Sequence, residues 1–207
     1  MASSVRDVFI NCPFDDGYHA SFEATVFAVI GCGFRVRCAR EMDDASETRI
    51  EKLYRIIGES RYGIHDLSRT QPDADNKLPR FNMPLELGMF LGAKRFGDDA
   101  QKRKSCIIFD TERFRFQKFV SDLAGMDIKA HEGDPRKMVG QIRDFLVTVS
   151  KRITIPTREE LLDSYDRFMN GLPAIAGNAG LDPKKLLFPD YERLVQSWVK
   201  ADHGQNF

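Results

Sequence analysis

The sequence has little that marks a membrane or secreted protein. No apolar run approaches the ~20 residues that a helix needs to cross a bilayer. The first residues, MASSVRD, lack the apolar stretch of a secretion signal. The four cysteines include no C-x-x-C pair and lie within or beside apolar segments, which is typical of core residues in a reducing compartment. We therefore expect a cytoplasmic protein that does not associate with a membrane.

The chain also lacks a charge excess and a metal-binding pattern. Its 207 residues include 31 lysines and arginines and 31 aspartates and glutamates. A surface built for nucleic acid carries a clear positive excess, so we expect no bulk nucleic-acid binding. The four histidines are scattered without the spacing of metal ligands, which argues against a structural metal.

Three familiar motifs are missing. No G-x-G-x-x-G follows the first apolar segment and no G-x-x-x-x-G-K occurs, which argues against an ordinary Rossmann dehydrogenase and a P-loop nucleotidase. The chain has no G-x-S-x-G elbow for Ser-His-Asp catalysis. Any active site must therefore use other residues.

What the chain does have is a regular alternation of strand and helix patterns. Short apolar runs predict five strands, at residues 5–12, 34–39, 62–67, 105–109 and 127–130. Apolar residues at helical spacing predict helices at 22–30, 47–60, 83–93 and 135–149. This alternation is typical of βαβ units with a parallel sheet. We predict an α/β, flavodoxin-like sheet of five parallel strands in the order 2-1-3-4-5, flanked by helices.

The pattern changes near residue 152. Thr157 and Glu160 form a capping box for a helix that we expect to end near Met169. A turn rich in glycine, proline and asparagine follows, and two short helical pieces start near residues 182 and 189. We therefore predict an α/β domain at residues 1–152 and a small C-terminal helical extension at residues 153–207, docked on the sheet domain or on a partner.

The most informative segment is FNMPLELGMFLGA, residues 81–93, because Glu86 is its only ionisable residue. A carboxylate among apolar side chains is costly to bury unless it is paired, hydrogen-bonded or facing a cavity, and its pKa tends to rise. Glu86 is therefore the first catalytic candidate; a position on the solvent face of the helix is the alternative. Gly88 and Gly92 predict a thin helix face that lies close to the sheet. Asn82 can cap this helix, and Ser46 the preceding one.

Candidate ligand-binding residues follow strand one, beside the point where the strand order reverses and flavodoxin-like proteins bind ligands. The strand ends in Asn-Cys-Pro-Phe, which leaves backbone N–H groups and the Asn11 side chain at the sheet edge. Phe14 and Tyr18 offer rings that can stack on a base; a tight turn with a ring plugging the core is the alternative. Cys12 is a weaker candidate as a nucleophile, since no histidine is placed by sequence to activate it.

A second group follows strands two and three. Asp66 and Ser68 stand at the end of strand three, where a carboxylate commonly holds ribose hydroxyls or orients another side chain, with a turn cap as the alternative. Asp44 and Arg49 would line the opposite rim, with Arg49 meeting a phosphate or remaining solvated. The predicted catalytic residues are Glu86 and Asp66. The predicted substrate-binding residues are Asn11, Cys12, Pro13, Phe14, Tyr18, Asp44, Arg49, Ser68 and Asn82.

Together these segments resemble the superfamily that joins nucleoside 2-deoxyribosyltransferase-like proteins with Toll/interleukin-1 receptor (TIR)-like domains. The resemblance covers roughly residues 7–130 and rests on the polar-Pro-Phe turn after strand one, on Asp66, and on Glu86 followed by Leu87 and Gly88. In deoxyribosyltransferases the corresponding glutamate is the nucleophile that takes up the sugar. In enzymatic TIR domains it supports cleavage of the nicotinamide–ribose bond of NAD.

The resemblance implies an N-glycosidase-type enzyme that cleaves or transfers the glycosidic bond of NAD or a related nucleotide, with a role in bacterial phage defence. Glu86 would stabilise or capture the oxocarbenium-like state. Asp66 would protonate a neutral base, whereas nicotinamide leaves NAD without a proton. NAD or a nucleotide is then the substrate, no cofactor is needed, and we expect a homo-oligomer.

Two other interpretations stay open. A non-catalytic module would bind a nucleotide signal or mediate assembly, and its Glu86 would lie in a closed core or be exposed, with no cavity reaching the strand ends. A phosphoryl-sensing receiver domain would use Asp66 and an acidic pair after strand one, which Asp15 and Asp16 superficially supply. A receiver would also have a lysine after strand four, where the sequence Asp-Thr-Glu stands instead.

Overall fold

The computed structural model describes residues 4–41, 46–72 and 77–203, and the chain divides into two compact units. One unit comprises Met1–Phe22 with Val36–Asp134, and the other comprises Glu23–Arg35 with Pro135–Phe207. The predicted division into residues 1–152 and 153–207 was placed where the sequence pattern changes, not by contacts in the structure, and it stays a prediction. No helix among the described residues is both long enough and apolar enough to cross a bilayer.

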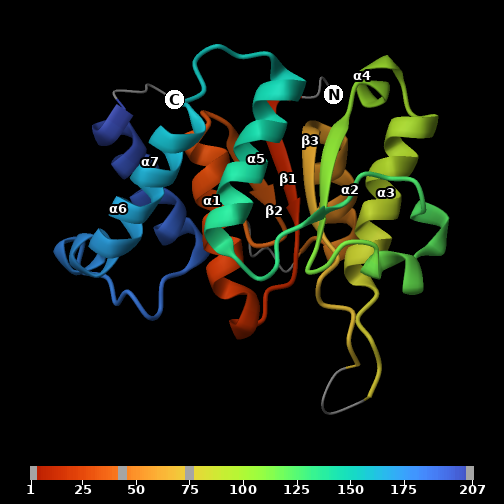
Figure 1. Cartoon of the computed structure of the whole chain (residues 1–207), viewed down its shortest axis with the longest axis horizontal. Helices are drawn as coiled ribbons and strands as arrows, with labels where there is room; N and C mark the ends of the chain where they lie inside the picture. Colours follow the sequence, from red (N-terminus) through yellow and green to blue (C-terminus); the bar gives the residue numbers. More distant parts are fainter. Residues whose placement is uncertain (1–3, 42–45, 73–76, 204–207) are drawn as a thin grey trace. The chain divides into compact units, whose positions relative to one another are not determined.

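All five predicted strands are present. They are β1 (Ser4–Asn11), β2 (Arg35–Cys38), β3 (Ser60–Asp66), β4 (Ser105–Asp110) and β5 (Lys129–Ala130). They form one sheet in the order β2-β1-β3-β4-β5. The pairs β1–β3, β3–β4 and β4–β5 are parallel, and β1 and β3 lie side by side in Figure 1. With its flanking helices, this sheet confirms the predicted α/β flavodoxin-like fold.

The two central strands are buried along most of their length. Residues 7–13 are all buried, and so are residues 62–68. Parallel strands that are covered on both faces read as continuous apolar runs, because neither face alternates with solvent. The polar residues within these runs must therefore find partners inside the protein.

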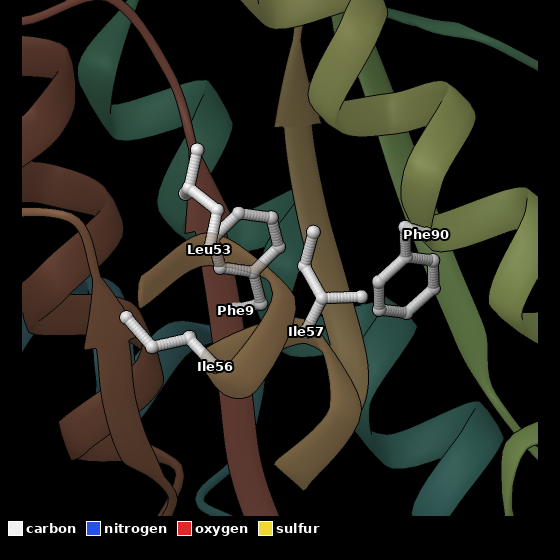
Figure 2. Close-up of a cluster of buried hydrophobic side chains, with 5 residues drawn as sticks. All are labelled: Phe9, Leu53, Ile56, Ile57 and Phe90. Atoms are coloured by element: carbon white, nitrogen blue, oxygen red, sulfur yellow. The ribbon is translucent and has the colours of Figure 1, made fainter. Parts of the chain in front are cut away.

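A hydrophobic cluster joins β1 to α2 (Arg49–Glu59) and α3 (Asn82–Phe96). Its members, shown in Figure 2, are Phe9, Leu53, Ile56, Ile57 and Phe90. The close approach of α3 to the sheet depends on Gly63 of β3. A Cβ at Gly63 would lie 3.0 Å from the Phe90 ring and 2.7 Å from His65 Nε2, so a larger residue would push the helix away.

Two helix starts differ from the prediction. Helix α2 begins after Thr48, which forms a capping box with Glu51, so Ser46 is not its cap. Asn82 is the first residue of α3, and Phe81 stands at the cap position without a side-chain capping hydrogen bond. The remaining elements before residue 135 are α1 (His19–Gly31), most of which belongs to the second unit, α4 (Asp99–Lys102) and the 3-10 turns η1 (Asp16–Tyr18), η2 (Arg115–Lys118) and η3 (Ser121–Leu123).

The second unit is helical and has an aromatic core. Its C-terminal helices are α5 (Pro135–Ser150), α6 (Arg158–Asn178) and α7 (Phe188–His203). The ring of Phe168 lies at the centre of this core. Its centroid is 5.4 Å from that of Phe27, 5.9 Å from that of Tyr191 and 5.8 Å from that of Trp198.

The course of the C-terminal helices differs from the prediction. Helix α6 continues past Met169 and through Pro173 instead of ending in a turn. Of the two helical pieces predicted to start near residues 182 and 189, the second is present as α7, which is 16 residues long, whereas residues 181–187 contain no helix. Phe168, Leu172 and Ala176 stay buried on both sides of the proline. This packing outweighs the backbone hydrogen bond that proline cannot donate, a loss of ~3 kcal/mol in a helix interior.

Candidate functional site

A cleft of about 550 Å³ lies at the carboxyl ends of β1 and β3. Its volume falls within the ~300–1,000 Å³ range of small-molecule sites. The segments after both strands line the cleft, together with the first turns of α2 and α3. Four predicted substrate-binding residues line it, namely Pro13, Phe14, Arg49 and Asn82. Another predicted substrate-binding residue, Asp44, lies outside the residues that the structure describes.

Arginines make the cleft positive. Arg49 lines it from the start of α2, and Arg69 and Arg80 from the connection between β3 and α3. Asp15 is the one acidic side chain among the cleft's described lining residues. Asp15 pairs with Arg69 at 3.0 Å. Guanidinium groups match the geometry of phosphate oxygens and bind them through two hydrogen bonds at once. The cleft therefore suits a ligand that carries phosphate.

Phe14 contributes an aromatic ring to the cleft wall. The Arg40 guanidinium lies 4.6 Å from the centroid of this ring, and the Phe22 ring meets it edge-on at 5.3 Å. Arg40 Nη2 also donates a hydrogen bond to the Phe14 carbonyl at 3.0 Å. These contacts hold both the ring and the backbone of the turn after β1 in place.

Glu86 is buried in the second turn of α3. It is only 4% exposed, which excludes the alternative of a carboxylate on the solvent face. Its Oε1 lies 3.6 Å from Nη2 of Arg49, one of the cleft-lining arginines. Burial raises the pKa of Glu86, and the charge of Arg49 acts in the opposite direction. Glu86 thus lies directly behind an arginine of the cleft.

The prediction that the glycines of α3 face the sheet is wrong. The buried face of α3 consists of Met83, Glu86, Leu87 and Phe90. Since an α-helix has 3.6 residues per turn, Gly88 and Gly92 fall on another side. Apart from the helix itself, no described atom lies within 4 Å of the place where a Cβ would stand at either glycine.

Asp66 is buried at the end of β3, where three groups contact it. It accepts hydrogen bonds from the Tyr18 hydroxyl and from the Ser68 backbone N–H, both at 2.7 Å. His131 Nε2 lies 3.2 Å from the same carboxylate. Burial opposes ionisation, but the contacts with His131, Ser68 and Tyr18 together hold the pKa of Asp66 below its usual range. Asp66 is therefore an ionised carboxylate that orients Tyr18 and His131, and it is not among the described residues that line the cleft.

The Asn11 side chain ties the end of β1 to α3. Its Nδ2 donates hydrogen bonds to the Met83 carbonyl at 2.8 Å and to His65 Nδ1 at 3.0 Å. Burial and the charge of Lys104 lower the pKa of His65 to about 3, so the ring is neutral and Nδ1 can accept. The first turn of the helix that carries Glu86 is thus anchored to the sheet.

Cys12 is a buried thiol that interacts electrostatically with the carboxylates of Asp66 and Glu86. Burial, followed by the charges of Asp66, Cys38 and Glu86, raises its pKa well above the usual value. Because the thiolate is the reactive form, we expect iodoacetamide to leave Cys12 unmodified in the folded protein at pH 7. Alkylation followed by peptide mass mapping measures this, with urea-unfolded protein as the control. Labelling of Cys12 at equal rates in both states would contradict the expectation.

Three side chains that hold the strand ends together were not predicted from the sequence. His131 directly follows β5. Its position after a strand could have predicted that it lies at the same sheet edge as the residues that follow β1 and β3. His65 lies inside β3 and has the sequence context of a core residue. Arg115 Nη2 donates to the carbonyls of Leu67 and Ser68, both at 2.9 Å. No local pattern identifies Arg115, because its partners are distant in the sequence.

Fold and cleft define a flavodoxin-like α/β protein with a basic cleft at the carboxyl edge of its sheet. The chain matches no family model and no curated protein. In the part of the chain that the structure describes, no group of three or more His, Cys, Asp or Glu residues is placed to hold a metal ion. The functional assignment therefore depends on the chemistry of the residues described above.

Proposed function

We propose that this protein cleaves or transfers the N-glycosidic bond of NAD or a related nucleotide. The observation that carries the proposal is Glu86, a buried carboxylate of raised pKa beside an arginine of a nucleotide-sized cleft. Glycosidic cleavage creates an oxocarbenium-like sugar. A fixed carboxylate in a water-poor site stabilises such a cation better than one in bulk water.

Asp66 constrains the leaving group. Because its pKa is lowered, Asp66 is ionised at neutral pH and has no proton to give to a departing base. A cationic leaving group needs no proton, and the nicotinamide of NAD is one. NAD is therefore a better candidate substrate than a nucleoside with a neutral base. A neutral base would need a proton from an acid, and the acid that the sequence suggests is Asp66.

The cleft arginines fit the phosphates of such a substrate. Arg49, Arg69 and Arg80 would bind the pyrophosphate, and the Phe14 ring offers an apolar surface for a base. An anion bound by Arg49 would also draw its guanidinium away from Glu86. The carboxylate would then be free to face the sugar.

A substrate panel tests the proposal. The purified chain is incubated with equal concentrations of NAD, nicotinamide mononucleotide, AMP and adenosine, and liquid chromatography resolves freed nicotinamide and adenine. We expect nicotinamide release from NAD to have the highest kcat/KM, because NAD alone combines two phosphates with a cationic leaving group. Release from none of the four at any protein concentration would contradict the proposal.

One observation favours a second candidate, a non-catalytic module that binds a nucleotide signal. In such a module the ion pair between Arg49 and Glu86 would hold the arginine in place for phosphate. In that case NAD or another nucleotide would raise the unfolding temperature by mass action, yet no product would form. Thermal shift and product analysis on the same samples distinguish the two functions.

Removal of Arg49 should shift the pH dependence of the reaction. Glu86 must be ionised to stabilise a cation, so activity falls as pH drops through its pKa. Arg49 holds that pKa down, and the Arg49→Ala variant should therefore lose activity at a higher pH than wild type. The measurement is kcat/KM as a function of pH, which reports the pKa of Glu86 in the free enzyme, with Arg49→Lys as the control that keeps the charge. Identical acid limbs in wild type and Arg49→Ala would exclude Glu86 as the titrating group.

A further inference from the structure

Arg115, the first residue of η2, fastens the start of the connection between β3 and α3. Its Nη2 donates hydrogen bonds to the carbonyls of Leu67 and Ser68, both at 2.9 Å, and its Nη1 donates to the Thr70 hydroxyl at 3.1 Å. These acceptors lie on both sides of Arg69, one of the arginines that line the cleft. The guanidinium of Arg115 therefore fixes the backbone from which Arg69 extends.

Arg115 is held in turn by the end of β4. Its Nε donates a hydrogen bond to Asp110 Oδ1 at 2.7 Å, and Asp110 is fully buried. The same Oδ1 accepts a hydrogen bond from the Thr111 backbone N–H at 2.7 Å, which keeps the carboxylate in place. A planar guanidinium that is bonded through Nε, Nη1 and Nη2 cannot turn without losing several of these bonds.

Arg69 reaches from the connection after β3 to the turn after β1. Its Nη2 lies 3.0 Å from Asp15 Oδ1. A Cβ at Gly17 would lie 2.1 Å from the same Nη2, so the guanidinium passes directly over the glycine of η1. The side chain of Arg69 is 44% exposed, and a long exposed side chain has many rotamers. Its fixed backbone and its contact with Asp15 limit the positions that its guanidinium can take.

We propose that Arg115 is a positioning residue for phosphate in the cleft and that it acts through Arg69. A binding group that is already in place loses less conformational entropy when the ligand arrives, and this raises affinity. Arg115 is not among the described residues that line the cleft, so its effect on the ligand is indirect. The inference rests on the proposed function only in that a ligand with phosphate occupies the cleft.

Lysine at position 115 separates positioning from charge. The contacts of Arg115 come from three nitrogens spread over a plane, whereas an ammonium group carries its donors at one point. Arg115→Lys therefore leaves a positive charge for Asp110 but cannot also hold the carbonyls and the hydroxyl on both sides of Arg69. Thr70→Val is a milder variant. It removes only the contact with Nη1 and keeps the shape of a partly exposed side chain.

Isothermal titration calorimetry with inorganic pyrophosphate tests the inference. We expect Arg115→Lys to raise the Kd for pyrophosphate roughly tenfold, which corresponds to the loss of about one hydrogen bond to a charged group. Thr70→Val should raise it by about two- to threefold. The number of sites per chain should stay the same in both variants. A purely structural role of Arg115 would instead lower the number of competent sites and leave Kd unchanged.

A double-mutant cycle shows whether Arg115 acts through Arg69. Arg69→Ala alone should weaken pyrophosphate binding, and Arg115→Lys should weaken it little further in that background. Fully additive effects would overturn the inference, because Arg115 would then act by another route. Arg143→Lys is the matched control. Arg143 donates to the Pro156 carbonyl at 2.8 Å within the second unit and is not among the described cleft-lining residues, so its substitution should leave Kd unchanged.

A wild-type Kd in both Arg115→Lys and Thr70→Val would overturn the inference, and so would a wild-type chain that does not bind pyrophosphate. The titration involves no cleavage. Pyrophosphate binding that depends on Arg115, without nicotinamide release from NAD, therefore counts against the proposed function alone. Nicotinamide release by a chain whose Kd for pyrophosphate does not depend on Arg115 counts against the inference alone.

Discussion

Glu86→Gln is expected to lower the rate of nicotinamide release from NAD by ~10³-fold, because it removes one fixed charge that stabilises the transition state. Glutamine has nearly the same shape as glutamate and keeps an oxygen near Arg49. It lacks the negative charge that would steady the sugar cation. Steady-state kinetics should therefore show the loss mainly in kcat, with KM for NAD nearly unchanged.

The same variant should not be less stable than wild type at pH 7. Burial raises the pKa of Glu86, so the folded state holds this proton more tightly than the unfolded state does. The stability linked to that proton is present at low pH and lost as pH rises through the raised pKa. Glutamine resembles the neutral form at every pH, so the unfolding temperature of Glu86→Gln should equal or exceed that of wild type at pH 7.

Glu112→Gln is the matched control for both measurements. Glu112 is exposed in the segment after β4 and is not among the cleft-lining residues. Its substitution should change neither the rate nor the unfolding temperature. Activity of Glu86→Gln within a few-fold of wild type would remove the catalytic role, while binding of NAD by the inactive variant would support it.

Phe90→Ala is expected to lower the free energy of unfolding by ~3–5 kcal/mol, the usual cost of truncating a buried phenylalanine. Phe90 is fully buried in the cluster that joins α3 to α2 and β1 (Figure 2). Its ring centroid lies 5.0 Å from that of His65 and 4.9 Å from Lys104 Nζ. Alanine would leave a cavity and would also remove a ring that faces a buried ammonium group.

Urea denaturation followed by circular dichroism measures this loss. Tyr54→Ala on α2 is the control, since Tyr54 is 58% exposed and the loss of its ring should change stability by less than ~1 kcal/mol. A similarly small effect of Phe90→Ala would show that the packing of α3 on the sheet is looser than the structure describes. The position of Glu86 would then be poorly held.

Local sequence patterns were sufficient for the strands and for most helices of the first unit. The apolar run at residues 105–109 became β4 (Ser105–Asp110) with almost unchanged ends. Caps and the continuation of helices were harder to predict. The choice of Thr48 over Ser46 depends on which hydroxyl reaches the N–H of Glu51, and α6 passes Pro173 because buried neighbours compensate for the proline.

For the candidate site, the sequence singled out Glu86, and the structure showed which residues contact it. Glu86 was conspicuous as the only acid among apolar neighbours, a feature visible in thirteen residues of sequence, 81–93. Its partner Arg49 comes from the start of α2, and this ion pair cannot be read from either segment. The same holds for Asp66, whose contacts Tyr18 and His131 come from two other parts of the chain.

The sequence by itself determined the alternation of strands and helices, hence the parallel sheet and the sheet edge at which the cleft lies, because periodicity and turn chemistry are local properties. Only the tertiary structure decided that Glu86 is buried behind Arg49, that Asp66 is held ionised, and that Gly88 and Gly92 face outward. These features depend on contacts between segments far apart in the chain. No local pattern encodes such contacts, since burial and charge pairing arise only when the elements pack.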